Sequence, residues 1–457
     1  MAPLLRYAMA LAMASQLVLS QRIEVECTPS KKCPDSKPCC SQYGQCGVGA
    51  YCLGGCDPKS STTVDACVPA PVCQSKTFKW DNLDSVAPNT KYLGDASKAD
   101  WVASGQPLTT GGNLLLTMAP ETVGTLLASN HYMWYGKTTA RLKTSRGKGV
   151  VTAFILLSDV KDEVDFEWIG SNLQDVETNY YFQGITDYSN GDTFKTEDTF
   201  NNFHLYEIDW TPEAVKWSID GKVVRTLERK STFNATTDQY NYPQSPSRVQ
   251  LSLWPGGLPS NGEGTIEWAG GLVNWEHPDI TNHGYYYATF DEVTIECYDP
   301  PANADIKGDT SYIFKDASGT EDTVQMTNKK TVLKSFLGTG VNMTADYPSK
   351  SSSSSSSKSP AESSDVAVIP GLTGGGPGTN GQRESEGKNN KDGDGGDGGD
   401  DGDGSPTNDW DRPATTGFTQ GNVDGPGDSN GASSQNEQML RGSLFAGLVA
   451  LTVLVTL

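Results

Sequence analysis

Apolar and polar residues alternate over short segments through the middle of this chain. Asp220-Gly221 separates two such segments and is typical of a type I′ hairpin turn. The pattern contains no long stretch with the apolar period of an amphipathic helix. Many short strands without helices favour an all-β fold, a sandwich or jelly roll. The predicted strands are Asn113–Met118, Thr138–Thr144, Gly149–Leu157, Val164–Ile169, His204–Trp210, Ala214–Ile219 and Arg248–Trp254.

The first twenty residues have a different pattern. Met1–Ser20 carries one early cation, Arg6, followed by an apolar run that ends in Val18-Leu19-Ser20. These are the parts of a secretory signal peptide, with cleavage expected near Gln21. A membrane helix is the alternative, but the stretch is short and polar residues follow at once.

The last residues are apolar as well. Leu444–Leu457 follows the polar spacer SSQNEQMLRGS, and small residues around Asn430 precede that spacer. Small residues, spacer and apolar tail form a GPI-anchor signal, in which residues 431–457 are removed. Asn430 is the expected attachment residue, with Ser429 and Ser433 close behind. A simple tail anchor is the alternative.

Secretion determines how the cysteines are interpreted. Nine of the ten lie between Cys27 and Cys73, and the tenth is Cys297. An even, clustered set in an oxidising compartment indicates disulfides rather than a metal site. Asn234 and Asn342 begin N-glycosylation sequons, which agrees with the same route.

Composition divides the mature chain into further zones. A cysteine-dense module is expected at 21–67, an all-β domain at 73–300 and a polar extension at 301–349. Residues 350–430 form a Ser/Gly/Asp-rich stalk that is expected to be disordered, since it cannot bury a core. Much of the net charge of −21 lies in this stalk, and nothing in the chain is basic enough to suggest nucleic acid binding.

The strongest chemical signal is the segment DEVDFEW. Successive strand residues point to opposite faces, so Glu163, Asp165 and Glu167 share one face and apolar side chains occupy the other. Three carboxylates in a row are unfavourable for folding, because they repel one another and are partly desolvated. A solvated acidic edge strand is the alternative. On a curved sheet, this row is suited to the floor of a catalytic cleft.

Two carboxyl groups roughly 5–5.5 Å apart are the machinery of retaining glycoside cleavage. Glu163 and Glu167 have Cα atoms roughly 13 Å apart on a regular strand. Curvature of the sheet and inclined side chains must therefore close much of this gap. Asp165 lies between them and is expected to position Glu163 and to keep Glu167 protonated.

Several segments resemble a known family. DEVDFEWIG resembles the signature of glycoside hydrolase family 16, and four further segments resemble the fungal Crh-type cell-wall transglycosylases. These are YGKTTARLKTSRGKGVVTAFILLSD, TNYYFQG, FHLYEIDWTPEAVKWSIDG and LWPGGLPSNGEGTIEWAGG. The resemblance runs from Met133 to Trp275 and implies a β-jelly roll with a concave substrate cleft. It also implies that Glu163 is the nucleophile and Glu167 the proton donor, and that chitin chains are transferred to β-glucan.

Candidate substrate residues occur elsewhere in the chain. Gln250 and Trp254 alternate along one strand with Ser252, giving an amide, an indole and a hydroxyl suited to a sugar. An ordinary strand with one core tryptophan is the alternative. The resemblance adds Thr265. Tyr180, Phe182 and Gln183 are further candidates, although the two aromatics could equally be packing residues. His204 could lie near the cleft or be a buried, hydrogen-bonded side chain.

The N-terminal module resembles the hevein-like chitin-binding module, through CCSQYGQC and the following Tyr51-Cys52. The resemblance implies that Ser41, Tyr43 and Tyr51 contact N-acetylglucosamine. Gln45 stands where an aromatic residue is usual, which should weaken binding. A disulfide knot with little sugar affinity is the alternative.

The same resemblance implies the pairs Cys27–Cys40, Cys33–Cys46 and Cys39–Cys52. Four cysteines then remain, with three possible pairings. We favour Cys56–Cys67 closing the module and Cys73–Cys297 joining the ends of the catalytic domain.

The predicted protein is a GPI-anchored, monomeric enzyme at the outer face of the plasma membrane or in the cell wall, acting on chitin and β-glucan. No cofactor or metal is expected, because the four histidines lack ligand spacing. A hydrolase would use the same residues with water as the acceptor, and the preference for transfer rests on the resemblance. A non-catalytic chitin-binding wall protein is the remaining alternative.

Overall fold

The computed structural model describes residues 25–348. The predicted signal peptide, the stalk, the attachment residue Asn430 and the anchor signal lie outside these residues. Within 25–348, no helix is long and apolar enough to cross a membrane.

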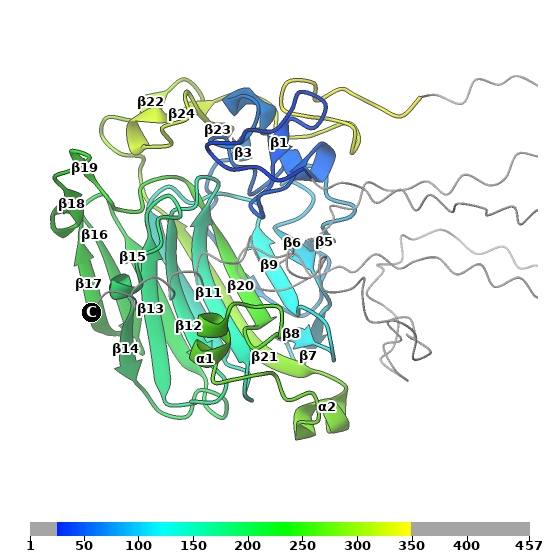
Figure 1. Ribbon diagram of the computed structural model, residues 1–457, viewed down its shortest axis with the longest axis vertical. Helices are drawn as coiled ribbons and strands as arrows, with labels where there is room; N and C mark the ends of the chain where they lie inside the picture. The colour runs from blue at the N-terminus through cyan, green and yellow to red at the C-terminus, as the bar shows by residue number, and fades with distance from the viewer. Residues whose placement is uncertain (1–24, 349–457) are drawn as a thin grey trace, which may run out of the picture.

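Two large β-sheets form the body of the protein (Figure 1). The first has the order β17-β16-β15-β10-β21-β8-β7, with β4 also paired to β21. Its strands are β17 (Lys222–Glu228), β16 (Ala214–Ile219), β15 (His204–Trp210), β10 (Gly136–Lys143), β21 (Tyr286–Cys297), β8 (Asn113–Met118), β7 (Pro107–Thr110) and β4 (Lys76–Lys79).

The second sheet carries the predicted catalytic strand and has the order β14-β13-β12-β11-β20-β9-β6-β5. Its strands are β14 (Asp192–Lys195), β13 (Asp175–Tyr181), β12 (Glu163–Ile169), β11 (Val150–Ser158), β20 (Ser247–Pro255), β9 (Thr125–Ser129), β6 (Trp101–Ser104) and β5 (Val86–Pro88).

One apolar core lies between the two sheets. Phe166 and Trp168 of β12 pack against Tyr206 of β15, with the Trp168 and Tyr206 rings 4.5 Å apart. Strands that bury one face in this way form a sandwich, which is the predicted fold. All seven predicted strands are present. Those at 113–118, 204–210 and 214–219 have the predicted bounds, and the others differ by one or two residues at an end.

The predicted hairpin turn is also present. Asp220 and Gly221 have φ values of 51° and 77°, and both are positive, as a type I′ turn requires. Helices are few, as expected. Only α1 (Glu263–Trp268) and α2 (Pro278–His283) occur in the described chain, beside the 3₁₀ turns η1 (Gly49–Cys52), η2 (Val64–Ala66), η3 (Tyr188–Asn190), η4 (Arg229–Thr232) and η5 (Glu321–Thr323). A small hairpin of β18 (Phe233–Asn234) and β19 (Gln239–Tyr240) carries the first sequon.

Disulfides hold the N-terminal module together around one strand pair, β1 (Cys39–Cys40) with β2 (Cys46–Gly47). The five bonds are the pairs expected from the sequence: Cys27–Cys40, Cys33–Cys46, Cys39–Cys52, Cys56–Cys67 and Cys73–Cys297. The sulfurs of Cys27, Cys33 and Cys40 lie close together, but each is in a disulfide and offers no thiolate to a metal.

The polar extension folds onto the module. Its strands β22 (Asp305–Ile306), β23 (Ser311–Phe314) and β24 (Val324–Thr327) form a sheet with β3 (Ala70–Pro71), which follows the module. Further on, Gly49 N–H donates to Gly338 O, and Leu333 packs in one apolar cluster with Tyr51 and Leu53. Figure 1 shows this yellow segment beside the blue module at one end of the sandwich.

Candidate active site

Glu163, Asp165 and Glu167 share one face of β12. In the antiparallel pairing with β13, they lie opposite Tyr181, Asn179 and Glu177, and in the pairing with β11 opposite Leu157, Ile155 and Ala153. The alternate residues Val164, Phe166 and Trp168 belong to the core. The three carboxyl groups therefore point away from the core, as the period-two pattern predicted.

The second sheet is held to the first directly behind these carboxyl groups. The indole N–H of the buried Trp217, on β16, donates to the backbone carbonyl of Asp165 at 3.0 Å. The Arg225 guanidinium lies over the Trp217 ring and donates to Thr178 O and Oγ1 on β13. These contacts fix the backbone of the catalytic strand from its apolar side.

A buried aspartate fixes the turn that leads into β12. Asp162 is fully buried, and its carboxylate accepts hydrogen bonds from Gln183 N–H, Gln244 N–H, and Ser245 N–H and Oγ. Four donors satisfy this carboxylate, which distinguishes it from the three that follow it in sequence. Asp162 therefore has a positioning role.

Glu163, Asp165 and Glu167 all have raised pKa values. Burial raises the pKa of Asp165 to about 7, although Arg225 acts in the opposite direction. Burial and the neighbouring Asp165 raise the pKa of Glu163 well above its usual value. Burial, Asp165, Glu163 and Glu177 do the same for Glu167. These shifts favour retention of a proton by the group, which is the form that an acid catalyst requires.

Strand β20 places polar side chains on the same face. Gln250 shares a row with Asp165 across Ile155, and Ser252 shares the next row with Glu167 across Ala153. The Gln250 amide and the Ser252 hydroxyl are buried and have no hydrogen-bond partner in the described chain, and the Trp254 indole N–H lies close enough to Glu167 to oppose the rise in its pKa. Buried polar atoms are normally paired, so the Gln250 and Ser252 atoms indicate a site for a hydroxyl-rich ligand.

Helix α1 lies near the Glu167 end of this face, because its Trp268 contacts Glu177, which is paired with Glu167. Figure 1 shows this helix in front of the second sheet. Its Trp268 stacks against Trp254, with ring centroids 6.0 Å apart, and donates its indole N–H to Glu177 at 2.7 Å. Thr265 lies on the same helix and is buried. The structure thus brings Gln250, Trp254 and the α1 segment to one face with the carboxyl groups.

The register of β13 shows that the prediction of Tyr180 as a substrate residue was wrong. Tyr180 pairs with Val164, packs against the core and lies near Arg225, so it faces away from the carboxyl groups. Phe182 is buried just beyond the strand. Tyr181 instead lies opposite Glu163, and all three carboxyl groups contribute to its raised pKa. Tyr180 is therefore replaced by Tyr181 as the tyrosine on this face.

The two remaining candidates have structural surroundings. Gln183 accepts from Lys59 of the module and donates its side-chain N–H to Ser318 O of the extension. His204 lies in the first sheet, where its Nδ1 and the Asp220 carboxylate are 2.7 Å apart. His204 is thus a buried, hydrogen-bonded side chain and not a cleft residue, which was the second of the two predicted alternatives.

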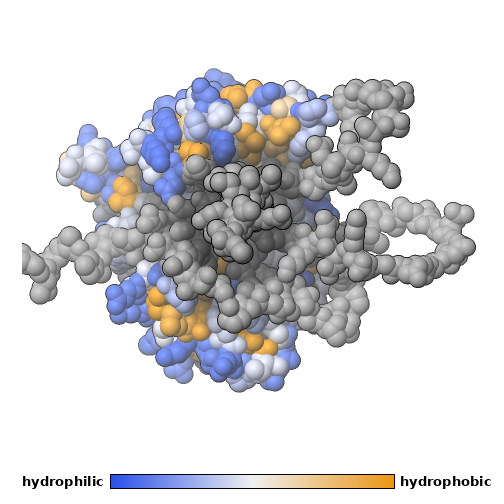
Figure 2. Space-filling model, turned by 45° about the vertical axis from the view of Figure 1, so that its right-hand side comes forward, coloured by the Kyte–Doolittle hydropathy of each residue, from blue (hydrophilic) through white to orange (hydrophobic). Residues whose placement is uncertain are grey.

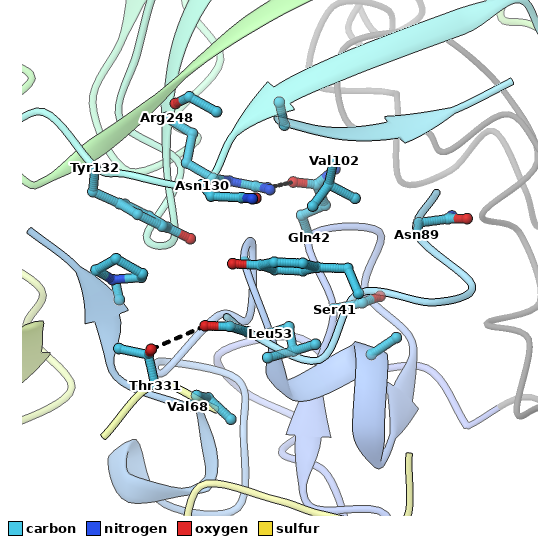
Figure 3. A pocket seen from close by; sticks show the side chains of 18 of the residues that line it. Ser41, Gln42, Leu53, Val68, Asn89, Val102, Asn130, Tyr132, Arg248 and Thr331 are labelled. Carbon is cyan, nitrogen blue, oxygen red and sulfur yellow. Dashed lines mark hydrogen bonds between the residues drawn. The ribbon is translucent and has the colours of Figure 1, made fainter. Parts of the chain in front are cut away.

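The module turns its predicted sugar-binding residues toward the catalytic domain. Ser41, Tyr43 and Tyr51 are all buried, and all line a pocket shared with Tyr132 and Arg248 (Figure 3). In this position they do not form an exposed platform for a separate chitin chain.

Paired carboxyl groups beside buried polar and aromatic side chains, on one face of a β-sandwich, are the arrangement that a glycoside hydrolase site requires. Residues 95–270 match the family described as glycosyl hydrolases family 16. Over 435 residues, 94% of both chains, the sequence is 54% identical to Crh-like protein 2 of Aspergillus fumigatus. It is 40% identical to Crh-like protein UTR2 of Candida albicans, over 93% of this chain and 92% of that protein. The chain belongs to the fungal Crh-like family of glycoside hydrolase family 16.

A solved structure described as apo Crh5 transglycosylase is also similar. It is 31% identical, with a TM-score of 0.47, and the match covers 59% of this chain and all of that one.

Sequence reasoning missed Tyr181, Glu177 and Arg248 on the carboxylate face. Each belongs to a strand whose register with its neighbour decides which side chains point to the carboxylate face. Register depends on tertiary contacts and is not contained in the local sequence. Arg248 did carry a signal, since it is the one charged residue of the strand Ser247–Pro255, whereas Glu177 has mostly polar neighbours and carried none.

Proposed function

We propose that this protein cleaves chitin with retention and transfers the released chain to β-glucan or chitin in the fungal cell wall. The observation that carries the proposal is the row of three carboxyl groups beside unpartnered polar atoms of Gln250 and Ser252. The family membership and the Crh5 transglycosylase among the similar structures support transfer as the reaction.

The three carboxyl groups have different tasks in this reaction. Glu163 attacks the anomeric carbon, while Glu167 gives its proton to the departing glycosidic oxygen, and the chain becomes bound to Glu163 as an ester. Glu167, now a carboxylate, removes the proton from an acceptor hydroxyl, whose oxygen attacks the anomeric carbon and releases Glu163. Asp165 keeps the pKa of Glu167 high and positions Glu163.

The module, the anchor and the location complete the proposal. Chitin binding by the module is proposed from its resemblance and its pocket residues, and GPI attachment at Asn430 from the terminal pattern. The enzyme acts as a monomer at the outer membrane face or in the wall. On the face that Figure 2 shows, the coloured atoms are a mixture of hydrophilic residues and separate apolar patches.

The test is incubation of the secreted protein with chitin oligosaccharides, with and without a fluorescent β-1,3-glucan oligosaccharide. We expect label in larger, chitin-containing products. Glu167→Gln should lower the rate by about 10²–10⁴-fold, the usual contribution of a general acid. Short chitin fragments without labelled products would establish a hydrolase instead. Unchanged transfer by Glu163→Gln would contradict the assignment of the nucleophile.

A further inference from the structure

The pocket between the module and the second sheet lies on the same face of that sheet as the three carboxyl groups. Directly paired residues share a face, and Arg248 pairs with Leu157, which pairs with Glu163. Arg248 is thus two strands from Glu163, roughly 10 Å between Cα atoms. One row further along, Gln250 pairs with Ala128 and Ala128 with Val102. Arg248, Ala128 and Val102 all line the pocket.

The module forms the opposite wall of this pocket. Gln42 Oε1 accepts from Arg248 Nη2 at 2.9 Å, as the dashed line in Figure 3 shows. Gly55 N–H donates to Asp159 Oδ1 at 2.9 Å, and Lys59 bonds Gln183. Three contacts at separate points, together with the packing of the extension, fix the orientation of the module against the sheet.

Two polar atoms in the pocket lack partners. Arg248 Nε and Asn89 Oδ1 form no hydrogen bond within the described chain. Both residues are buried, with only 7% and 8% of their surface exposed. Tyr43 and Tyr92 add aromatic surface to the same lining. A charged donor, an amide acceptor and aromatic rings fit a neutral chain with hydroxyl and acetamido groups.

We infer that this pocket is a composite subsite for a sugar of the chitin chain, remote from the bond that is cleaved. The floor comes from the catalytic sheet and the wall from the module, so the module extends the cleft instead of binding a separate chain. The inference rests on the proposed function, because it assigns part of the same substrate chain.

A graded series of chitin oligosaccharides tests this, from chains shorter than the cleft to chains that span it. For the full secreted protein, kcat/KM for transfer should rise when a chain becomes long enough to reach the pocket. Asn89→Ala and Arg248→Lys should each reduce this rise roughly 2- to 10-fold, the effect of one lost hydrogen bond. Asn202→Ala, at an exposed loop position, is the matched control and should show the full rise.

The outcomes separate the two proposals. An equal loss for short and long chains, or no loss in either variant, would overturn the composite subsite while leaving the reaction intact. If no oligosaccharide is turned over at all, the proposed function fails first. Calorimetric titration of the longest chain into wild type and Asn89→Ala then decides the subsite: weaker binding by the variant supports it, and equal or undetectable binding refutes it. Melting temperatures close to wild type show that both variants fold.

Discussion

Asp162 and Asp165 are two aspartates of one short segment with opposite surroundings. Asp162 accepts four hydrogen bonds and is fully satisfied, whereas Oδ1 of Asp165 has no partner in the described chain. Asp165 is therefore the one that responds to the charge state of the glutamates beside it, and the pKa values of all three shift together.

Asp165→Asn should displace the pH dependence of activity toward acid. Removal of this negative charge lowers the pKa of both Glu163 and Glu167. Glu163 then becomes a nucleophile at lower pH, and Glu167 loses its proton at lower pH, so both limbs of the profile move the same way. The measurement is kcat/KM for transfer across pH. A variant that lost activity without displacement of either limb would show that Asp165 only holds the geometry.

How far such residues can be predicted depends on what determines their position. Glu163 and Glu167 follow from the period of a single strand, and Gln250 and Trp254 from the alternation along another. Tyr180 and Tyr181 are adjacent and therefore point to opposite faces of the sheet. Only the pairing of β13 with β12 decides which of the two lies on the carboxylate face. The inward orientation of Tyr43 likewise depends on docking of the module, which no local pattern contains.

Among the elements, β12 combines a well-packed apolar face with a poorly stabilised acidic one. Its core side packs Phe166 and Trp168, while the opposite side gathers three groups whose charged forms are disfavoured by burial. The acidic residues that the reaction requires therefore make the folded state less stable than it would be with neutral side chains at the same positions.

Glu163→Gln should raise the melting temperature at pH 7 and have less effect near pH 4.5. The pKa of Glu163 is raised in the folded state, so above the unfolded pKa the folded state binds more protons. The free energy of unfolding therefore falls as pH rises through the window between the two pKa values, and glutamine removes this loss. Calorimetry at both pH values measures the difference. Equal changes at the two pH values would point to altered packing instead.

Behind β12, the contact from β16 makes the other sheet part of the site. Trp217→Phe keeps an aromatic ring but leaves the Asp165 carbonyl without its donor. We expect a loss of about 1–3 kcal/mol in the free energy of unfolding, since a buried acceptor becomes unpaired. Denaturant unfolding measures this. Trp275→Phe, at a half-buried position that takes no part in this hydrogen bond, serves as the control. A stability equal to wild type in Trp217→Phe would remove this bond from the account of how β12 is held.

For the whole molecule, the bond between Cys73 and Cys297 closes the longest loop, with a sequence separation of 224 residues. It joins the segment that leaves the module to the end of β21, the long strand of the first sheet.

The double variant Cys73→Ser/Cys297→Ser should lose about 2–5 kcal/mol in the free energy of unfolding, because the unfolded chain gains freedom. Thermal unfolding of the secreted protein measures the change. The double substitution leaves no unpaired thiol to exchange with the four module disulfides, so it is cleaner than either single one. An unchanged midpoint would mean that packing alone holds these ends.

The contact between the module and residues 305–348 has a consequence for biosynthesis. Lys329 and Asp65 form an ion pair across 264 residues of sequence, and Leu333 completes the apolar cluster around Tyr51. At roughly 5–20 residues per second, ribosomes need on the order of 15–50 s to add the segment between these partners. During this interval the nascent module has all its cysteines, but the extension that packs against it has not yet been synthesised. Packing of the N-terminal module against residues 305–348 is therefore completed only after the far end of the described chain has been translated.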